Sequence, residues 1–151
     1  MRKGPALLTL IVACAALLAL LLPASPASQA PKPTSLAQTL RELRWKKRVL
    51  LVAAPRPEQA DFQAQKLLLA PVARELAERD ILVLDVLYHR LSAADRQYLT
   101  RKTGVRLLAF AAVLIGKDGG VKLTSARPLA PAALFAAVDQ MPMRQDELRR
   151  P

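Results

Sequence analysis

The segment 113–123, VLIGKDGGVKL, constrains the fold of this chain more than any other part of the sequence. An apolar run, a glycine-rich turn and a second run follow one another, which is the pattern of a β-hairpin. The pair Asp118-Gly119 favours a type I′ turn, in which both central residues have positive φ. We predict a strand over residues 110–115 and a return strand that alternates inward Val121 and Leu123 with outward Lys122 and Thr124.

The glycine-rich turn also resembles a phosphate-binding loop. It lacks the helix that follows such a loop and the Lys-Ser/Thr ending that the loop requires. Hairpin chemistry explains its glycines, so we assign no ligand to residues 117–120.

Residues 49–54 form a continuous apolar run, as in a strand that helices cover on both faces, and prolines end it. Residues 80–87 are predicted to form a second strand that is buried on both sides. Helices are predicted around them from apolar residues three or four positions apart. The first helix follows the N-cap Ser35, and the second runs from Phe62 to Leu76 with a break at Pro71. The third begins at the capping pair Ser92 and Asp95 and ends before Gly104. The last runs from Pro131 to Met141.

The predicted order is helix, strand, helix, strand, helix, strand, strand, helix. A strand-helix-strand crossover followed by an antiparallel hairpin and a closing helix gives an α/β fold. We expect three layers, with a mixed four-stranded sheet between helices. Trp45 lies between the first helix and the first strand, where a lone tryptophan is expected to be a core wedge, with a surface recognition residue as the alternative.

The N-terminus has the three-part layout of a secretory signal peptide: Arg2 and Lys3, an apolar run over residues 6–22, and small residues after it. The predicted signal peptide covers residues 1–27, with cleavage as late as residue 30 as an alternative. The run is close to the roughly 17-residue minimum for spanning a bilayer, so retention as an inner-membrane anchor stays open. We therefore expect an exported protein, either periplasmic or secreted.

After the leader, we predict a tether over residues 28–34, one domain over residues 35–144 and a basic C-terminal tail over residues 145–151. The one cysteine, Cys14, lies in the leader, either as another apolar residue or as part of a lipobox-like stretch. Once the leader is removed, no thiol remains for a disulfide, for nucleophilic catalysis or for a metal site.

The formal net charge is +11, and the positive residues are dense in two segments. They are Arg41, Arg44, Lys46, Lys47 and Arg48 in the first segment and Arg144, Arg149 and Arg150 in the second. In an exported protein, such charge meets anionic lipid headgroups or polysaccharide more often than nucleic acid, which is not the expected partner. A solvated basic surface without a ligand is the alternative.

Several separate segments together resemble one protein family. They are Trp45 with Arg48, residues 49–54, Gln65, Glu78-Arg79-Asp80, residues 114–123, and Asp139 with Met141-Pro142-Met143-Arg144. On these residues the chain resembles the bacterial domain of unknown function 4174, a thioredoxin-like family related to the DUDES domains of animal extracellular proteins. The resemblance covers essentially the whole chain after the leader.

This resemblance implies a thioredoxin-like fold, an exported location and a relation to redox proteins. In thioredoxins and peroxiredoxins, the reactive cysteine lies just after the first strand, near a helix N-terminus that lowers its pKa. The corresponding residues here are 54–61, APRPEQAD, which contain no cysteine. Dithiol exchange and thiol peroxidase activity therefore have no catalytic atom in the mature chain.

Arg56, Asp85 and His89 are the only candidates for catalysis without sulfur. Asp85 and His89 lie near the carboxyl end of the second strand, where open α/β sheets bind ligands. Residues four apart on a strand are separated by more than about 13 Å, so the pair cooperates only if the chain turns back at Tyr88. A surface loop position for His89 is the alternative.

The segment Met141-Pro142-Met143-Arg144 is the candidate partner-binding site. Thioethers adapt to a partner groove, and Arg144 can pair with a carboxylate. Packing of the helix end over the sheet is the alternative. No cofactor or metal site is predicted, since the sequence has no two-histidine helix and no acidic calcium loop.

The sequence thus favours a non-catalytic binding or accessory module of the envelope, with an unidentified envelope protein as partner. A non-thiol enzyme, or an oxidoreductase-like protein related to oxidative stress, is one alternative. An electrostatic binder of anionic envelope surfaces is another.

Overall fold

The computed structural model describes residues 34–150 of the 151-residue chain. The predicted signal peptide, the anchor over residues 6–22 and Cys14 lie outside these residues. Within the described part of the chain, no helix is long and apolar enough to cross a bilayer.

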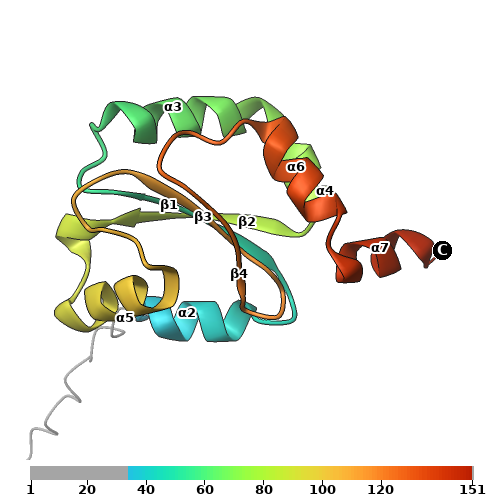
Figure 1. The fold of residues 1–151 in the computed structure, drawn as a ribbon, viewed down its shortest axis with the longest axis horizontal. Coiled ribbons are helices and arrows are strands. Elements are labelled where there is room, and N and C mark those ends of the chain that lie inside the picture. Colours follow the sequence, from blue (N-terminus) through green and yellow to red (C-terminus); the bar gives the residue numbers. More distant parts are fainter. Residues whose placement is uncertain (1–33, 151) are drawn as a thin grey trace, which may run out of the picture. The chain divides into compact units, whose positions relative to one another are not determined.

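A mixed four-stranded sheet forms the centre of the fold (Figure 1). Its strands are β1 (Arg48–Ala54), β2 (Ile81–Leu87), β3 (Ala111–Ile115) and β4 (Val121–Ser125), in the order β2-β1-β3-β4. β1 pairs in parallel with β2 and antiparallel with β3, and β3 pairs antiparallel with β4. The predicted mixed sheet is confirmed, with its crossover connection between β1 and β2.

Helices cover both faces of this sheet, as predicted. On one side lie α3 (Ala60–Leu69), α4 (Ala73–Glu78) and α6 (Pro131–Asp139), and on the other side lie α2 (Leu36–Leu43) and α5 (Ala93–Thr103) (Figure 1). β1 is buried along its whole length, and its side chains alternate between two apolar clusters. Leu50 and Val52 join one cluster, whereas Leu51 and Ala53 join the other. Burial on both faces explains why residues 49–54 are continuously apolar.

The predicted break in the long helical pattern is confirmed. α3 ends at Leu69, and the short 3₁₀ turn η1 (Ala70–Val72) separates it from α4. Pro71 causes this break, because proline has no amide hydrogen to donate within a helix.

Both ends of α5 also agree with the sequence signals. Ser92 is the N-cap, and its Oγ accepts a hydrogen bond from the Asp95 amide at 3.1 Å. Gly104 ends the helix with φ of 70°, a left-handed conformation that glycine adopts without strain. A capping pair and a terminal glycine were therefore sufficient to place this helix.

The two outer strands are less buried than predicted. The expectation that residues 80–87 are covered on both faces is wrong, because β2 lies at an edge and Leu82 is 38% exposed. The inward position predicted for Val121 is also wrong, since this side chain is 37% exposed. A register shift in the β3–β4 pairing interrupts the alternation of side chains there, while Leu123 still packs against the core as predicted.

The predicted hairpin is confirmed, but its turn is not type I′. Gly119 has φ of 81°, whereas Asp118 does not have positive φ. The Gly119 amide donates to the Gly116 carbonyl, and the Gly116 amide donates to the Gly120 carbonyl, each at 2.9 Å. The loop is therefore the three-residue kind, in which a turn is followed by a glycine in the left-handed conformation.

The prediction that Trp45 is a core wedge is wrong. Its side chain is 59% exposed, and its backbone has φ of 65°, which turns the chain sharply between α2 and β1. The Arg44 guanidinium lies 5.1 Å from the centroid of the indole ring. Burial of an aromatic residue here depends on the direction of this turn, which the local sequence pattern does not specify.

The described chain ends in α7 (Pro142–Arg149), a helix that the sequence analysis does not predict. α6 stops before Pro142 as expected, but this proline then occupies the first turn of α7, where proline is tolerated. The domain boundary predicted at residue 144 falls inside α7. None of the residues of α7 is buried, so its attachment must depend on something other than apolar packing.

Candidate functional site

The resemblance described above places the reactive-cysteine position of thioredoxins and peroxiredoxins in the loop after β1. β1 ends at Ala54, and α3 begins at Ala60 after Gln59, whose side chain makes no capping hydrogen bond. Residues 54–61 contain no sulfur. The N-terminus of α3 therefore has no thiolate to stabilise.

No hydrogen bond or ion pair within residues 34–150 joins Arg56, Asp85 and His89. Asp85 is exposed on β2, and its two carboxylate oxygens lie 2.9 and 3.0 Å from Lys66 Nζ. His89 is exposed after β2, with Nδ1 3.0 Å from the Pro55 carbonyl oxygen, and Arg56 is exposed in the loop. In this part of the chain, no group of three or more His, Cys, Asp and Glu side chains is placed to hold a metal ion.

Charged side chains gather instead at the opposite end of β1, beside the hairpin. Arg48, the first residue of β1, has a side chain that is only 1% exposed. Its Nη1 and Nη2 donate to the two carboxylate oxygens of Glu147 in α7, each at 3.2 Å, and Nη1 also donates to the Arg79 carbonyl at 2.9 Å. A buried guanidinium needs such partners, because an unpaired charge away from water is costly.

Lys117 of the hairpin contacts the same group of residues. Its Nζ lies 2.7 Å from Glu147 Oε1 and 3.0 Å from Asp80 Oδ2, and its side chain is mostly buried. Asp80 has φ of 52°, a left-handed conformation that aspartate tolerates better than most residues. Its other carboxylate oxygen pairs with Lys47. The hairpin, the connection from α4 to β2, and α7 are thereby linked.

A second set of ion pairs connects α6 with α7. Arg79 donates to the Asp139 carboxylate through Nε and Nη2 at 2.8 to 3.2 Å, and its guanidinium lies 4.5 Å from the centroid of the Phe135 ring. Arg144 lies 3.5 Å from Asp139 and 3.5 Å from Glu147. We call the whole group the ionic cluster, which consists of Arg48, Arg79, Asp80, Lys117, Asp139, Arg144 and Glu147.

The ionic cluster keeps its carboxylates charged. The hydrogen bond from Lys47 lowers the pKa of Asp80, and the hydrogen bond from Arg79 lowers the pKa of Asp139. For Glu147, partial burial acts to raise the pKa, but hydrogen bonds from Lys117 and Arg48 lower the pKa overall. The cluster is therefore a set of ion pairs at neutral pH, and α7 is attached to the sheet through it.

A hollow of about 400 Å³ lies between the hairpin and the start of α7. Its apolar lining comes from Ala137, Met141, Pro142 and Met143, and Lys117 and Lys122 border it from the hairpin. We call it the methionine hollow. The predicted partner-binding segment is thus divided, because Met141 to Met143 line the hollow while Arg144 pairs with carboxylates of the ionic cluster.

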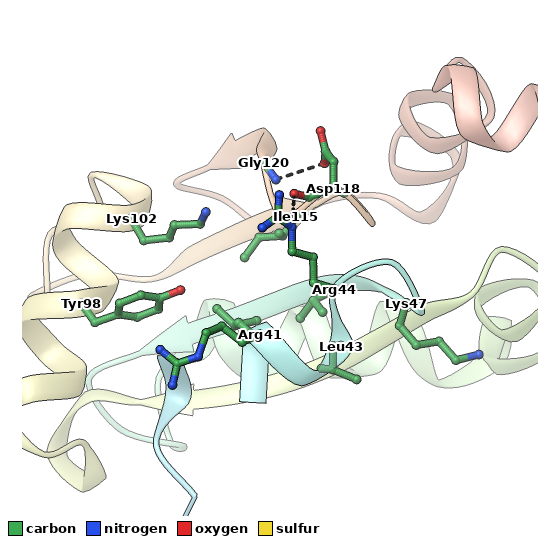
Figure 2. Close-up of a pocket in the computed structure, with 13 residues that line it drawn as sticks. Arg41, Leu43, Arg44, Lys47, Tyr98, Lys102, Ile115, Asp118 and Gly120 are labelled. Carbon is green, nitrogen blue, oxygen red and sulfur yellow. Dashed lines mark hydrogen bonds between the residues drawn. The ribbon is translucent and has the colours of Figure 1, made fainter. Parts of the chain in front are cut away.

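A second hollow, of about 350 Å³, lies between α2, α5 and the hairpin turn (Figure 2). We call it the basic hollow. Of the predicted basic segment, Arg41, Arg44 and Lys47 line it, and Lys102 of α5 adds another cation. Arg48 does not contribute to an exposed positive surface, because it is buried in the ionic cluster.

The family model for a domain of unknown function, DUF4174, matches residues 39–147. The chain belongs to this family. Among the curated relatives, coiled-coil domain-containing protein 80 from Danio rerio is 28% identical over 141 residues, which cover 78% of this chain and 16% of the relative. The DUF4174 chain thus spans a small part of that relative's length, in agreement with the predicted relation to the DUDES domains.

Solved structures similar to the DUF4174 chain include reduced 2-Cys peroxiredoxin from Plasmodium vivax. It has a TM-score of 0.53 and 15% identity, with coverage of 72% of this chain and 84% of the peroxiredoxin. Oxidized mitochondrial thioredoxin 3 from Saccharomyces cerevisiae has a TM-score of 0.50 and 14% identity, with coverage of 72% and 92%. At these identities the similarity establishes the fold alone, and the predicted thioredoxin-like fold is confirmed.

The segments that carry the family resemblance meet in the DUF4174 structure. Arg48, Arg79-Asp80, Lys117 and the Asp139 region are distant in sequence but form the ionic cluster. The sequence identifies these segments but does not show that they meet, and no pattern used above singles out Glu147. One signal was available, since Glu147 follows Arg144 by three positions, which is the spacing of an ion pair on a helix.

Gln65, another residue of the resemblance, has a structural role in the DUF4174 fold. Its side chain is fully buried, and its amide group donates to the Leu129 carbonyl at 3.1 Å and accepts from the Leu129 amide at 2.7 Å. These two hydrogen bonds satisfy the backbone of the segment that leads into α6. Gln65 therefore holds the segment between β4 and α6 in place, and its hydrogen bonds are accounted for without a ligand.

Proposed function

We propose that this DUF4174 domain is an exported, non-catalytic binding module of the envelope, and that the methionine hollow holds a protein partner. The observation that carries the proposal is the position of the family residues. They build the hairpin end of the sheet, while the loop that holds the thiol in thioredoxins is left without a nucleophile.

The methionine hollow has properties that suit an apolar side chain of a partner. Met143 is 39% exposed, and methionine adapts its shape to a bound group better than branched side chains do. The ionic cluster fixes α7 against the hairpin through Glu147, so the two walls of the hollow are held in place before binding. Such pre-organisation reduces the ordering cost of binding.

The catalytic alternative has less support in the contacts of its residues. Asp85 is occupied by Lys66, and His89 contacts a backbone carbonyl. A general base must lie within hydrogen-bond reach of the proton that it abstracts, and the acid and the base must face one shared pocket. The sequence candidates Arg56, Asp85 and His89 do not contact one another in this way.

Site-specific photo-crosslinking in the native cells tests the binding proposal. A photoreactive residue at Gln140, which borders the methionine hollow, is expected to capture one specific protein. Adding Met143→Asp should abolish that capture, because a carboxylate in an apolar hollow excludes an apolar side chain. Leu67→Asp, at a 74% exposed position on α3, is the matched control and should leave capture intact. Capture that survives Met143→Asp contradicts the proposal.

A thiol activity assay tests the non-catalytic part separately. The purified chain is expected to reduce insulin disulfides and to consume peroxide no faster than a protein-free control, because residues 34–150 contain no cysteine. Turnover clearly above the control would show a redox centre that involves Cys14 or another group.

A further inference from the structure

The basic hollow holds more positive charge than its own acidic groups neutralise. Arg41 and Lys102 make no ion pair with any described residue of the chain. The guanidinium of Arg44 lies over the Trp45 ring, and only its Nε donates a hydrogen bond, to the Asp118 carbonyl oxygen at 3.0 Å. Figure 2 shows Tyr98 and Lys102 extending from α5, Arg41 reaching toward that side from α2, and Lys47 pointing away. Three cations therefore surround the hollow with donors still free.

The single carboxylate at the hollow is already occupied. Asp118 Oδ2 lies 2.7 Å from Lys122 Nζ, and Oδ1 accepts a hydrogen bond from the Gly120 amide at 3.0 Å. The hydrogen bond from Lys122 lowers the pKa of Asp118, so this carboxyl group is charged and paired at neutral pH. It is not the counterion of Arg41 or Lys102.

The floor of the basic hollow is apolar. Leu40, Val49 and Ile115 are buried there, and Leu43 and Tyr98 are partly buried beside them. Cations around a concave apolar surface concentrate their field, because the walls have a low dielectric constant. A flat solvated basic surface lacks this arrangement, so the geometry points to a discrete anion site.

We infer that the basic hollow binds a phosphate-bearing group, with Arg41, Arg44 and Lys102 as its ligands. A phosphate monoester carries close to two negative charges at neutral pH and presents several acceptor oxygens, which suits three cations from two helices. The apolar floor then contacts the carbon skeleton next to the phosphate. This inference stands on the basic hollow alone and does not depend on a protein partner in the methionine hollow.

The site is tested on the full chain with two substitutions that remove its unpaired cations. The double variant Arg41→Ala/Lys102→Ala is compared with Arg101→Ala/Arg106→Ala, which removes two exposed cations outside the hollow. The control lowers the net charge equally, and Arg101 is the direct neighbour of Lys102 on α5. Circular dichroism confirms that both variants fold, since all four side chains are exposed.

Two probes distinguish a soluble phosphate compound from a lipid headgroup. In the first arm, glycerol 3-phosphate is titrated by calorimetry. In the second arm, vesicles of phosphatidylcholine with phosphatidic acid, whose headgroup is a phosphate monoester, are compared with pure phosphatidylcholine vesicles. We expect the hollow variant to bind one probe about tenfold more weakly than the wild type, and the control variant to change by less than about twofold. Binding should also fall as salt rises, since exposed charges are screened over about 8 Å at physiological ionic strength.

If the hollow variant, but not the control variant, loses binding to glycerol 3-phosphate, the ligand is a soluble phosphate compound. If the hollow variant, but not the control variant, loses binding to vesicles, the ligand is a lipid headgroup. Either result supports the inference. Equal losses in the hollow and control variants would show that general positive charge is responsible, and would overturn it. Absence of binding to both probes in the wild type would overturn it as well.

Discussion

The two ends of the central sheet in this DUF4174 domain have opposite characters. At the carboxyl end of β1, the loop over residues 54–61 is exposed at Arg56 and contains no cysteine. At the other end, Arg48, Lys117 and Glu147 are joined by ion pairs that span strand, hairpin and C-terminal helix. The thioredoxin-like fold is thus kept, while its organised polar groups lie at the end away from the usual thiol position.

This difference teaches that fold and function separate within one domain. The buried side chains of β1 alternate between the two apolar clusters and so determine the three layers. This packing does not depend on which end of the sheet carries a functional site. The hairpin end contains two costly features, the buried Arg48 guanidinium and the left-handed backbone at Asp80. Substitutions at the two ends should therefore have unequal effects.

Glu147→Ala should give the largest loss of stability. It leaves the buried Arg48 guanidinium and the mostly buried Lys117 without their shared carboxylate, which should reduce the free energy of unfolding by about 2–3 kcal/mol. Urea denaturation measures the change. The matched control is Asp146→Ala on the same helix, whose exposed pair with Arg149 should contribute less than about 0.5 kcal/mol. Equal losses for the two variants would mean that the ionic cluster has no special role.

Acid should weaken the hairpin end through the same residues. Asp80, Asp139 and Glu147 have folded-state pKa values below their ordinary values of 3.8, 3.8 and 4.5. The unfolded chain therefore binds more protons at low pH, so the contribution of these groups is present above about pH 4.5 and is lost as pH falls through the folded-state values. Urea midpoints between pH 6 and pH 3 should fall less steeply for Glu147→Gln than for the wild type. The same slope in both proteins would contradict this assignment.

Gly119→Ala should have an intermediate effect on stability. Its φ of 81° is strained for a residue with a Cβ atom, which should cost about 1–2 kcal/mol and alter the hairpin turn. Gly120→Ala, at a neighbouring position without positive φ, should cost less. Thermal unfolding of the two variants measures the difference. A smaller loss for Gly119→Ala than for Gly120→Ala would refute the three-residue loop.

The carboxyl end of the sheet should show the smallest effects. Arg56→Ala and His89→Ala change exposed side chains, so each should alter the free energy of unfolding by no more than about 0.5 kcal/mol. Neither should change crosslinking from Gln140 or binding of a phosphate compound. A loss of either binding activity in these variants would place the functional site at the carboxyl end of the sheet, and would contradict the proposed difference between the two ends.

The sequence predicted those parts of the structure that depend on neighbouring residues. Periodicity and caps located α5, and the unbroken apolar run over residues 49–54 located β1. The exposure of Trp45 was not predictable in this way, because it depends on the backbone direction at one residue with positive φ.

The candidate site was only partly predictable for a related reason. Met141 to Met143 were identified from their chemistry, and Arg41 and Arg44 from charge density. The partners that complete each hollow, Lys117 and Lys102, are distant in sequence, so only the tertiary structure brings them together. Pairing of Arg48 with Glu147 likewise joins residues 99 positions apart.

The attachment of α7 through charges has a consequence for motion. A helix with no buried residue lacks the apolar contacts that make segments unfold together with the core, so the ion pairs of Glu147 are the main barrier to its local opening. Its backbone amides should then exchange with deuterium far earlier than those of β1. Because the start of α7 is also one wall of the methionine hollow, any guest that bridges the two walls should slow this exchange.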